Sequence, residues 1–386
     1  MHLLPADVLP VDASTATLVG RVWSEDGGAG PRTCVYRDGQ LHDLSSLAPT
    51  LADLFDLDAV AQRVQHSQAV PLCTLADALE RGWLLAPCDL QALKAAGVTF
   101  ACSLIERVIE ERALGDAAAA AAVRDELTAV LGGSLRNIRP GSATADAAKR
   151  VLVARGLWSQ YLEVGIGTDA EVFTKAQQMS AVGCGAEIGL HPRSAWNNTE
   201  PEIVLAVSSG GSIVGATLGN DLTLRDFEGR SALLLPQAKD NNASCAIGPF
   251  VRLFDATYSL DDVRSAEVHL SVEGADGFAE HGTNSQVESS RDAAYLVRAT
   301  LGRHHQYPDG LMLFLGTMFV PQKDRGVPGR GFTHVPGDRV RIASPRLGAL
   351  HNIVTTSDRA PPWTFGTREL MKSLAARGLL TRTTPH

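Results

Sequence analysis

The sequence predicts an α+β protein, mostly β, with a small α/β domain at residues 1–86 and a larger domain at residues 87–386. From about residue 161 onward, short apolar runs alternate with turns rich in Gly, Pro, Asn and Asp, which is the pattern of successive β-strands. Residues 101–160 are rich in Ala, Leu, Glu and Arg, which favour helix. The first 86 residues contain strand and helix patterns of their own.

The elements are expected in the following order. In the first domain, TATLVGRVW (15–23) and the two halves of RTCVYRDGQLHDLSSL (32–47) are expected to be strands, and the Asp-Gly pair between those halves predicts a hairpin turn. LADLFDLDAVAQRVQ (51–65) has helical periodicity.

The second domain is expected to begin with a short strand near residues 98–101 and to continue as helix. The alanine run at 117–122 fits that helix, because Ala has the highest helix propensity. The later expected strands are EIVLAV (202–207), SIVGATLG (212–219), SAEVHLSVEG (265–274) and DRVRIASPRLGALHNIVTT (338–356).

Composition and charge argue against several classes of partner. The chain has 386 residues, a formal net charge of −8 and no cluster of Lys or Arg, so neither a nucleic acid nor a membrane surface is expected as a partner. No stretch approaches the ~20 apolar residues of a membrane span, and the first residues lack the basic start of a secretory leader. A cytoplasmic location is therefore expected. The six cysteines occur singly, without the spacing of a zinc site or a disulfide framework.

Three carboxylates are the most informative residues of the chain. Glu200 and Glu202 are two residues apart, so on a strand both side chains point to the same face. Asp221 follows after a Gly-rich turn, at a distance that one hairpin returns to the starting point, and Lys239 lies further along. Three carboxylates with open positions are typical of a Mg²⁺ or Mn²⁺ site. The alternatives to a metal site are a solvent-exposed strand face for the two glutamates and a surface position for the lysine.

Several motifs occur in order along residues 87–370: NNTEPEIVLAV, LGNDLTLRDFEGRS, KDNNASCAIGPF, LGTMF, HVPGDRVRI and LGALHNIV. In these motifs the chain resembles the fumarylacetoacetate hydrolase superfamily. The resemblance implies a β-roll of mixed sheets and assembly as a homodimer or a dimer of dimers. It also implies that Glu200, Glu202 and Asp221 hold Mg²⁺ or Mn²⁺, and that Lys239 is an active-site lysine. The substrate-binding residues that it implies are Ser103, Lys175, Arg225, Asn242, Gly316 and Thr317, with Gly316-Thr317 holding the substrate carboxylate. The alternative for Asn242 is that it satisfies a buried turn.

The chain departs from the hydrolases of this superfamily at one position. The hydrolases carry an NYxxHxxE-like segment whose His, paired with a Glu, activates water for C–C cleavage. The corresponding segment here, residues 99–106, has Ser103 in place of the His and retains Glu106. A serine hydroxyl is no general base near neutral pH, because its proton is held too tightly. The pattern resembles instead the sugar-acid dehydratases of the superfamily, which act on 2-keto-3-deoxy-pentonates.

The resemblance therefore implies a metal-dependent hydro-lyase whose substrate is a small 2-keto acid. A 2-keto-3-deoxy-pentonate of the xylonate or arabinonate type would give 2-oxoglutarate semialdehyde (2,5-dioxopentanoate) by enolisation at C3 and loss of the C4 hydroxyl. Glu106 and Lys239 are the expected catalytic residues, and the sequence leaves open which takes the first proton. By itself, Glu106 would also fit an exposed helix with Glu–Arg pairs. Two alternatives stay open: a C–C hydrolase or decarboxylase of acylpyruvate-type substrates, and a sugar-acid binding protein without turnover.

Overall fold

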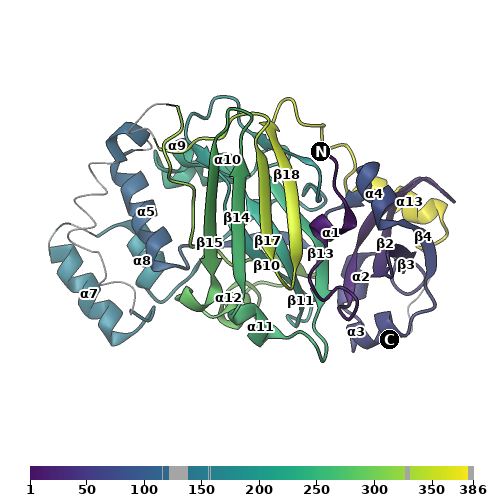
Figure 1. Ribbon diagram of the computed structural model, residues 1–386. Helices are drawn as coiled ribbons and strands as arrows, with labels where there is room; N and C mark the ends of the chain where they lie inside the picture. The colour runs from purple at the N-terminus through teal and green to yellow at the C-terminus, as the bar shows by residue number, and fades with distance from the viewer. Residues whose placement is uncertain (115, 121–137, 155, 157, 327–330, 381–386) are drawn as a thin grey trace.

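The computed structural model describes residues 1–114, 116–120, 138–154, 156, 158–326 and 331–380. In these residues two β-sheets pack against each other, and helices flank them at both ends of the molecule (Figure 1). No helix within these ranges is long and apolar enough to cross a membrane.

The larger sheet has eleven strands in the described part of the chain. Neighbouring strands are antiparallel except for β16 and β6, which are parallel. In spatial order the strands are β4 (Val70–Thr74), β3 (Gln40–Asp43), β2 (Gly30–Arg37), β1 (Leu18–Ser24), β13 (Cys245–Leu253), β11 (Ile213–Asp221), β10 (Pro201–Val207), β16 (Leu311–Phe314), β6 (Ala92–Gly97) and β7 (Glu171–Ala176), and β5 (Leu84–Leu85) pairs with β1.

A second sheet covers one face of the first. Its strands are, in order, β15 (Ala279–Ser285), β14 (Glu267–Glu273), β17 (Arg339–Ser344), β18 (Gly348–Thr356) and β8 (Glu187–Leu190), of which only the β18–β8 pair is parallel. β9 (Asn197–Asn198) and β12 (Thr223–Leu224) form a separate two-stranded sheet. In the sequence β9 comes just before β10, and β12 comes just after β11.

The central strands of the larger sheet are buried on both faces. Ile203 and Leu205 of β10 belong to the apolar cluster that includes Leu270 and Ile342 of the second sheet. The alternate residue Val204 belongs to a different cluster on the opposite face. Because side chains alternate along a strand, an uninterrupted apolar run fits a strand covered on both sides. This explains why EIVLAV lacks the polar alternation of a surface strand.

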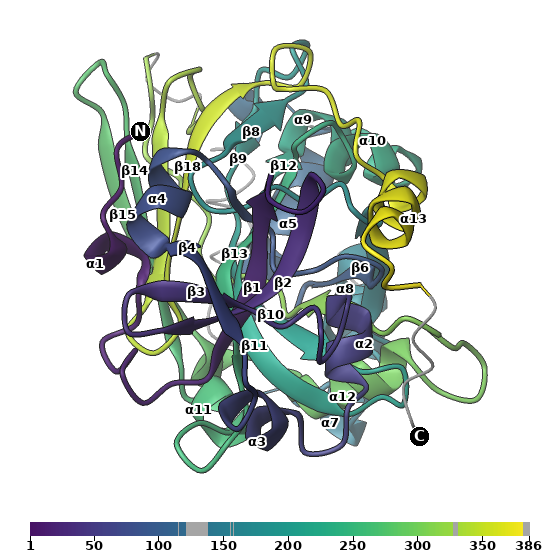
Figure 2. The ribbon, with the colours of Figure 1, turned by 90° about the vertical axis from the view of Figure 1, so that its right-hand side faces the viewer.

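Residues 1–86 continue the larger sheet. β1 pairs with β13 in the register Leu18 with Arg252, and the strands β2 to β4 follow at this end of the molecule (Figure 2). Helix α13 (Thr367–Ala376) packs against β2, where Ser373 donates a hydrogen bond to the carbonyl oxygen of Ala29 at 3.3 Å. The helices of this end are α1 (Pro5–Val8), α2 (Leu51–Phe55), α3 (Val60–Gln65), α4 (Leu75–Glu80) and α13 (Thr367–Ala376).

Further helices flank the other end and the strand connections. At the far end lie α5 (Ala101–Arg112), α7 (Ala143–Ala154) and α8 (Gln160–Ile166) (Figure 1). The remaining described helices are α9 (Arg225–Glu228), η1 (Ala232–Leu234), α10 (Leu235–Lys239), α11 (Leu260–Arg264), η2 (Gln286–Glu288) and α12 (Ala293–Thr300).

The predicted α+β class with mostly strand is confirmed. The Asp-Gly hairpin is confirmed too, because Asp38 and Gly39 both have positive φ, as a two-residue turn between twisted strands requires. The strand expected near residues 98–101 is wrong: β6 ends at Gly97, Val98 has a left-handed backbone with φ +55°, and α5 begins at Ala101. A short apolar run fits a strand and the start of a buried helix equally well.

One prediction is confirmed in part, and another remains without a test. The alanine run is helical where it is described, and its last two residues, 121 and 122, lie outside the described residues. The division of the chain after residue 86 stays a prediction, and the larger sheet runs across that point.

Candidate active site

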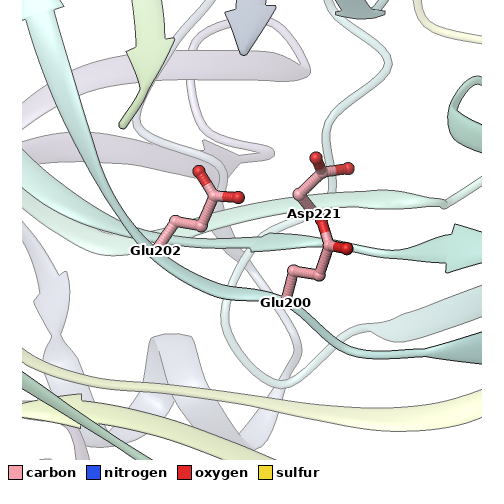
Figure 3. Close-up of side chains that lie close together, drawn as sticks. All are labelled: Glu200, Glu202 and Asp221. Atoms are coloured by element: carbon pink, nitrogen blue, oxygen red, sulfur yellow. The ribbon is translucent and has the colours of Figure 1, made fainter. Parts of the chain in front are cut away.

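Three carboxylates meet where β10 begins and β11 ends. Glu200 directly precedes β10, and Asp221 is the last residue of β11. The antiparallel register places Glu202 opposite Gly219, so Glu200 lies opposite Asp221, whose N–H donates to the carbonyl oxygen of Glu200 at 3.1 Å. Since side chains two residues apart share a face, the carboxylates converge (Figure 3). Their oxygens lie within 4.8 Å of one another, and all three residues are buried.

The turn after β16 holds Glu202 in place. The N–H of Gly316 donates to Glu202 Oε2 at 2.6 Å. Gly316 has φ +88°, and a Cβ at this position would lie 2.1 Å from Thr99 Oγ1, so glycine is required here. A small pocket adjoins the three carboxylates, and Gly316 and Thr317 both line it. The hydroxyl of Thr317 donates to the carbonyl oxygen of Phe319 at 2.9 Å. Gly316 and Thr317 therefore both lie at the site. Gly316 is connected to it by its hydrogen bond to Glu202, a candidate metal ligand.

Lys239, at the end of α10, reaches two of the carboxylates. Its Nζ lies 2.8 Å from Glu200 Oε2 and 2.8 Å from Asp221 Oδ2, and it also donates to the hydroxyl of Thr223. Burial by itself lowers the pKa of an ammonium group, but the Asp221 and Glu200 carboxylates outweigh it and raise the pKa of Lys239 above its ordinary value. The ammonium is therefore charged and offsets part of the negative charge of the three acids.

A second buried lysine positions the first. Lys175 Nζ donates to the backbone carbonyl oxygens of Lys239 and, at 3.1 Å, of Leu222, and it lies 3.0 Å from Asp221 Oδ1. The residue is fully buried and is not among the described residues that line the pocket. This geometry gives Lys175 a positioning role, and its predicted contact with substrate stays a prediction.

The three acids fit a divalent cation. Burial and then repulsion from Asp221 and Glu200 raise the pKa of Glu202 well above its ordinary value. Burial acts in the same direction on Glu200, but Lys239 and Arg107 lower its pKa to about 2. The neighbouring cations therefore relieve the repulsion at Glu202 only in part, because Lys239 lowers the pKa of Glu202 less than burial and the two acids raise it. Convergent, anionic and purely oxygen donors are the ligands that Mg²⁺ and Mn²⁺ prefer.

Arg107 attaches helix α5 to this site. Its Nη2 pairs with Glu200, and its Nη1 lies 2.8 Å from Glu110 Oε2 and 2.8 Å from Glu228 Oε2. Sequence reasoning missed Arg107, although it lies four residues after Ser103 and therefore on the same helix face. Ser103 lines the pocket, and its hydroxyl donates to the carbonyl oxygen of Phe100 at 2.9 Å. Its predicted contact with substrate stays a prediction.

Glu106 faces a neighbouring ion pair. Arg225 Nη2 lies 3.0 Å from Glu106 Oε2, Arg225 Nε lies 2.6 Å from Glu110 Oε1, and the guanidinium stacks 4.3 Å above the ring of Trp196. Neither Glu106 nor Arg225 is among the described lining residues of the pocket. Their predicted roles in catalysis and substrate binding stay predictions, and the observed contacts dock α5 onto α9.

The predicted residue Asn242 points to the C-terminal segment. Its side-chain amide donates to the carbonyl oxygens of Ser357 at 3.1 Å and Pro361 at 3.2 Å. This matches the alternative in which Asn242 satisfies a turn, and it leaves the substrate contact as a prediction.

Two further acids line the pocket. Glu171 opens β7, and its carboxylate lies directly over the backbone of Gly97. Among the described residues it has no hydrogen-bond partner, and burial raises its pKa. Burial also raises the pKa of Glu228, to about 7, against the pull of Arg107. Neither acid was singled out from the sequence: Glu228 stands in the motif RDFEGRS, and Glu171 carries no local signal.

The pocket itself is small. The open volume between these side chains is about 20 Å³, roughly the room that one water molecule needs. A five-carbon acid therefore requires movement of one wall, and α5 forms such a wall through Ser103 and Arg107.

The chain is similar to known proteins both in sequence and in structure. No family model matches it. It is 34% identical over 198 residues to a protein named "Probable 2-keto-3-deoxyxylonate dehydratase" from Haloferax volcanii, which covers 51% of this chain and 64% of that protein. It is 32% identical over 187 residues to 2-dehydro-3-deoxy-D-arabinonate dehydratase from Saccharolobus solfataricus, which covers 47% of this chain and 57% of that protein. The chain thus spans less than two thirds of the length of either relative.

The solved structures agree over more of the chain. A 2-keto-3-deoxy-D-arabinonate dehydratase complexed with magnesium and 2,5-dioxopentanoate has a TM-score of 0.59 at 20% identity, over 88% of this chain and 99% of that chain. The fumarylacetoacetate hydrolase of Exiguobacterium antarcticum has a TM-score of 0.54 at 16% identity, over 88% of this chain and 100% of that chain.

The chain therefore shares its fold with these structures of a dehydratase and a fumarylacetoacetate hydrolase. Its sequence is similar to dehydratases of 2-keto-3-deoxy-pentonates, so both predicted resemblances are confirmed.

Proposed function

We propose that this protein is a metal-dependent hydro-lyase that converts a 2-keto-3-deoxy-pentonate to 2,5-dioxopentanoate and water. One observation carries the proposal: Glu200, Glu202 and Asp221 converge within 4.8 Å, with Lys239 Nζ 2.8 Å from two of them. The relatives named for this reaction support the choice of substrate class.

Mg²⁺ or Mn²⁺, held by the three carboxylates, would supply positive charge at the keto and carboxylate oxygens of the substrate, where negative charge develops during enolisation. The structure related in fold and complexed with magnesium supports Mg²⁺ as the native ion. The chain's own part is to orient the substrate and move protons. The turn at Gly316 and Thr317 faces the pocket beside Glu202, where it fits the role of holding the substrate carboxylate.

The reaction needs a base for the C3 proton and an acid for the departing C4 hydroxyl. One proton leaves C3, and the C4 hydroxyl takes up a proton and departs as water. A proton then moves from C5 to C3 to give an enol, and the enol gains a proton at C4 as its C5 hydroxyl loses one, which gives the aldehyde. Lys239 is charged in this geometry, so it suits the acid role at the departing hydroxyl.

Glu171 is the better placed base. It lines the pocket, has no hydrogen-bond partner among the described residues, and has a pKa that burial raises toward neutrality. Glu106, by contrast, pairs with Arg225. We therefore assign the C3 proton to Glu171 and a positioning role to Glu106, through the Arg225 pair that docks α5.

The hydrolase alternative lacks its water-activating group. Ser103 stands where the hydrolases of the superfamily carry a His, and no histidine is among the described residues that line the pocket. This observation favours dehydration over hydrolytic C–C cleavage.

The test is a substrate panel with the Mg²⁺-loaded protein. Formation of 2,5-dioxopentanoate from 2-keto-3-deoxy-xylonate or 2-keto-3-deoxy-arabinonate, followed with a coupled aldehyde dehydrogenase, supports the dehydratase. Cleavage of an acylpyruvate at a comparable rate would support the hydrolase instead, and binding of the pentonate without turnover would support a sugar-acid binding protein. Glu202→Gln is the matched inactive control for each arm.

The assembly and the location of the protein belong to the same proposal. A homodimer or a dimer of dimers follows from the superfamily resemblance, and a cytoplasmic location stays the expectation. Light scattering coupled to size exclusion tests the first, and cell fractionation tests the second.

A further inference from the structure

A second cavity adjoins the pocket that holds the three carboxylates. Its volume is about 140 Å³. Glu171 and Glu228 line both spaces, so the two acids form the shared wall. Gln160 and Ala232, which also line the second cavity, are exposed. The cavity therefore lies between the surface and the metal-site pocket, and we call it the outer cavity.

The walls of the outer cavity come from two helical segments. On one side, α8 contributes Gln160, Tyr161 and Val164, which share one face of the helix. On the other side lie Ala232 of η1 and Leu235 of α10. The same α10 carries Lys239 at its end, so one short helix connects the outer cavity with the three carboxylates.

Tyr161 gives the outer cavity a polar contact. The residue is 6% exposed, and among the described residues its hydroxyl has no hydrogen-bond partner. The hydroxyl is not fully enclosed by protein atoms, so it is open to the cavity, where a ligand hydroxyl can form a hydrogen bond with it. The exposed amide of Gln160 offers a second donor and acceptor beside it.

The charge of the outer cavity restricts what it accepts. Glu171 and Glu228 are acids, and none of the described lining residues is a cation. Arg107 lines the metal-site pocket but not the outer cavity, and both of its Nη atoms already pair with carboxylates. A second carboxylate on a ligand would therefore find no cation to pair with in the outer cavity, and it would be repelled by the two acids in their ionised form. The volume holds several water molecules and so also a short neutral chain with hydroxyl groups.

We propose that the outer cavity is the subsite for the uncharged, hydroxylated end of the substrate, and that it selects 2-keto acids with a neutral end against those that end in a second carboxylate. Tyr161 is the specificity-determining residue for the terminal hydroxyl. The inference rests on the proposed function in one respect: the 2-keto acid end must bind at the three carboxylates.

The first test compares three ligands that need no turnover. Pyruvate reaches only the metal-site pocket, 2-oxopentanoate adds a neutral end, and 2-oxoglutarate has the same chain length with a terminal carboxylate. In calorimetric titrations of the Mg²⁺-loaded protein, 2-oxopentanoate is expected to bind at least about tenfold more tightly than 2-oxoglutarate. Equal or tighter binding of 2-oxoglutarate would overturn the subsite and leave the metal-site proposal standing. Absence of binding by all three would overturn both.

The second test places a cation in the outer cavity. Leu235→Lys is expected to reduce the preference for 2-oxopentanoate to less than about threefold, because the ammonium would pair with the terminal carboxylate. Leu233→Lys is the matched control: this leucine is 89% exposed, does not line the outer cavity and should keep the full preference. An unchanged preference in a folded Leu235→Lys variant would contradict the subsite. If that variant does not fold, the ligand comparison with the unmodified protein decides the question.

The third test removes the tyrosine hydroxyl. Tyr161→Phe is expected to lower kcat/KM for the pentonate about two- to tenfold, the effect of one neutral hydrogen bond. Its affinity for 2-oxopentanoate, which has no hydroxyl at its end, should stay within about twofold of the unmodified protein. Tyr36→Phe, at the far end of the larger sheet, is the matched control and should change neither value. Equal losses for both ligands in Tyr161→Phe would mean that the tyrosine is structural, and would overturn its role in specificity.

Discussion

Glu202→Gln should make the protein more stable in the absence of a divalent cation and should lose that advantage when the cation is present. Glutamine keeps the shape of the side chain and can still accept the hydrogen bond from Gly316. Without a cation, the change removes one of three buried carboxylates that repel one another. Protonating a carboxyl group of ordinary pKa 4.5 at pH 7 costs about 3 kcal/mol, and the raised pKa of Glu202 means that the folded protein bears up to that cost. The variant should therefore be more stable than the unmodified protein in chelator, by up to about 3 kcal/mol.

With the cation present, the variant loses this advantage. At a free Mg²⁺ concentration of 100 times Kd, the ion stabilises the unmodified protein by about 2.7 kcal/mol, and the variant loses most of this gain with its ligand. For 386 residues the unfolding entropy is about 0.8 kcal/mol/K, so each effect corresponds to a Tm change of roughly 3 to 4 °C.

Calorimetric unfolding in chelator and in Mg²⁺ measures both effects of this substitution. Glu163→Gln is the control, because the side chain of Glu163 is 50% exposed and lies outside the site. A Mg²⁺-induced rise in Tm as large in Glu202→Gln as in the unmodified protein would refute the reasoning, and so would a lower Tm of the variant in chelator.

Three further predictions concern the groups around the carboxylates. Lys239→Met should fold in Mg²⁺ but lose at least about 10²-fold in kcat, because the stem keeps its packing while the ammonium is lost; turnover near that of the unmodified protein would contradict the assignment. Glu171→Gln should lower kcat by about 10²-fold, whereas Glu106→Gln should mainly lower Tm through its pair with Arg225; the reverse pattern would give the proton transfer to Glu106. The pKa of Glu228 is about 7 in the folded protein against an ordinary 4.5, so its contribution to stability is fully present below pH 4.5 and is lost as the pH rises through 7. Unfolding of Glu228→Gln across this range should show a flatter pH dependence, and an unchanged slope would contradict the shift.

The central acids were predictable because their spacing has a direct geometric meaning. Two glutamates two residues apart share a strand face, and a hairpin brings Asp221 back opposite Glu200. Both features depend on local sequence alone. Lys239 followed from its motif, and α10 carries it to the carboxylates. The alternative of a solvated strand face for the two glutamates is excluded, since both are 2% exposed.

The surroundings of the acids were less predictable because they depend on tertiary packing. Arg107 and Glu106 are neighbours on α5, and the sequence pattern does not tell which of them faces the carboxylates. The docking of α5 on Arg225 and Glu228 decides this, and it turns Arg107 toward the pocket. Glu171 reaches the pocket because β7 pairs with β6 at the edge of the larger sheet. β6 itself is far from β10 in the sequence.

The most direct measurement of the central claim is ¹³C NMR of a labelled 2-keto-3-deoxy-pentonate incubated with the protein in Mg²⁺ and in chelator. The account predicts complete conversion to 2,5-dioxopentanoate in Mg²⁺, and no conversion in chelator or with Glu202→Gln. The appearance of pyruvate with a two-carbon fragment, or conversion that chelator leaves unchanged, would contradict it.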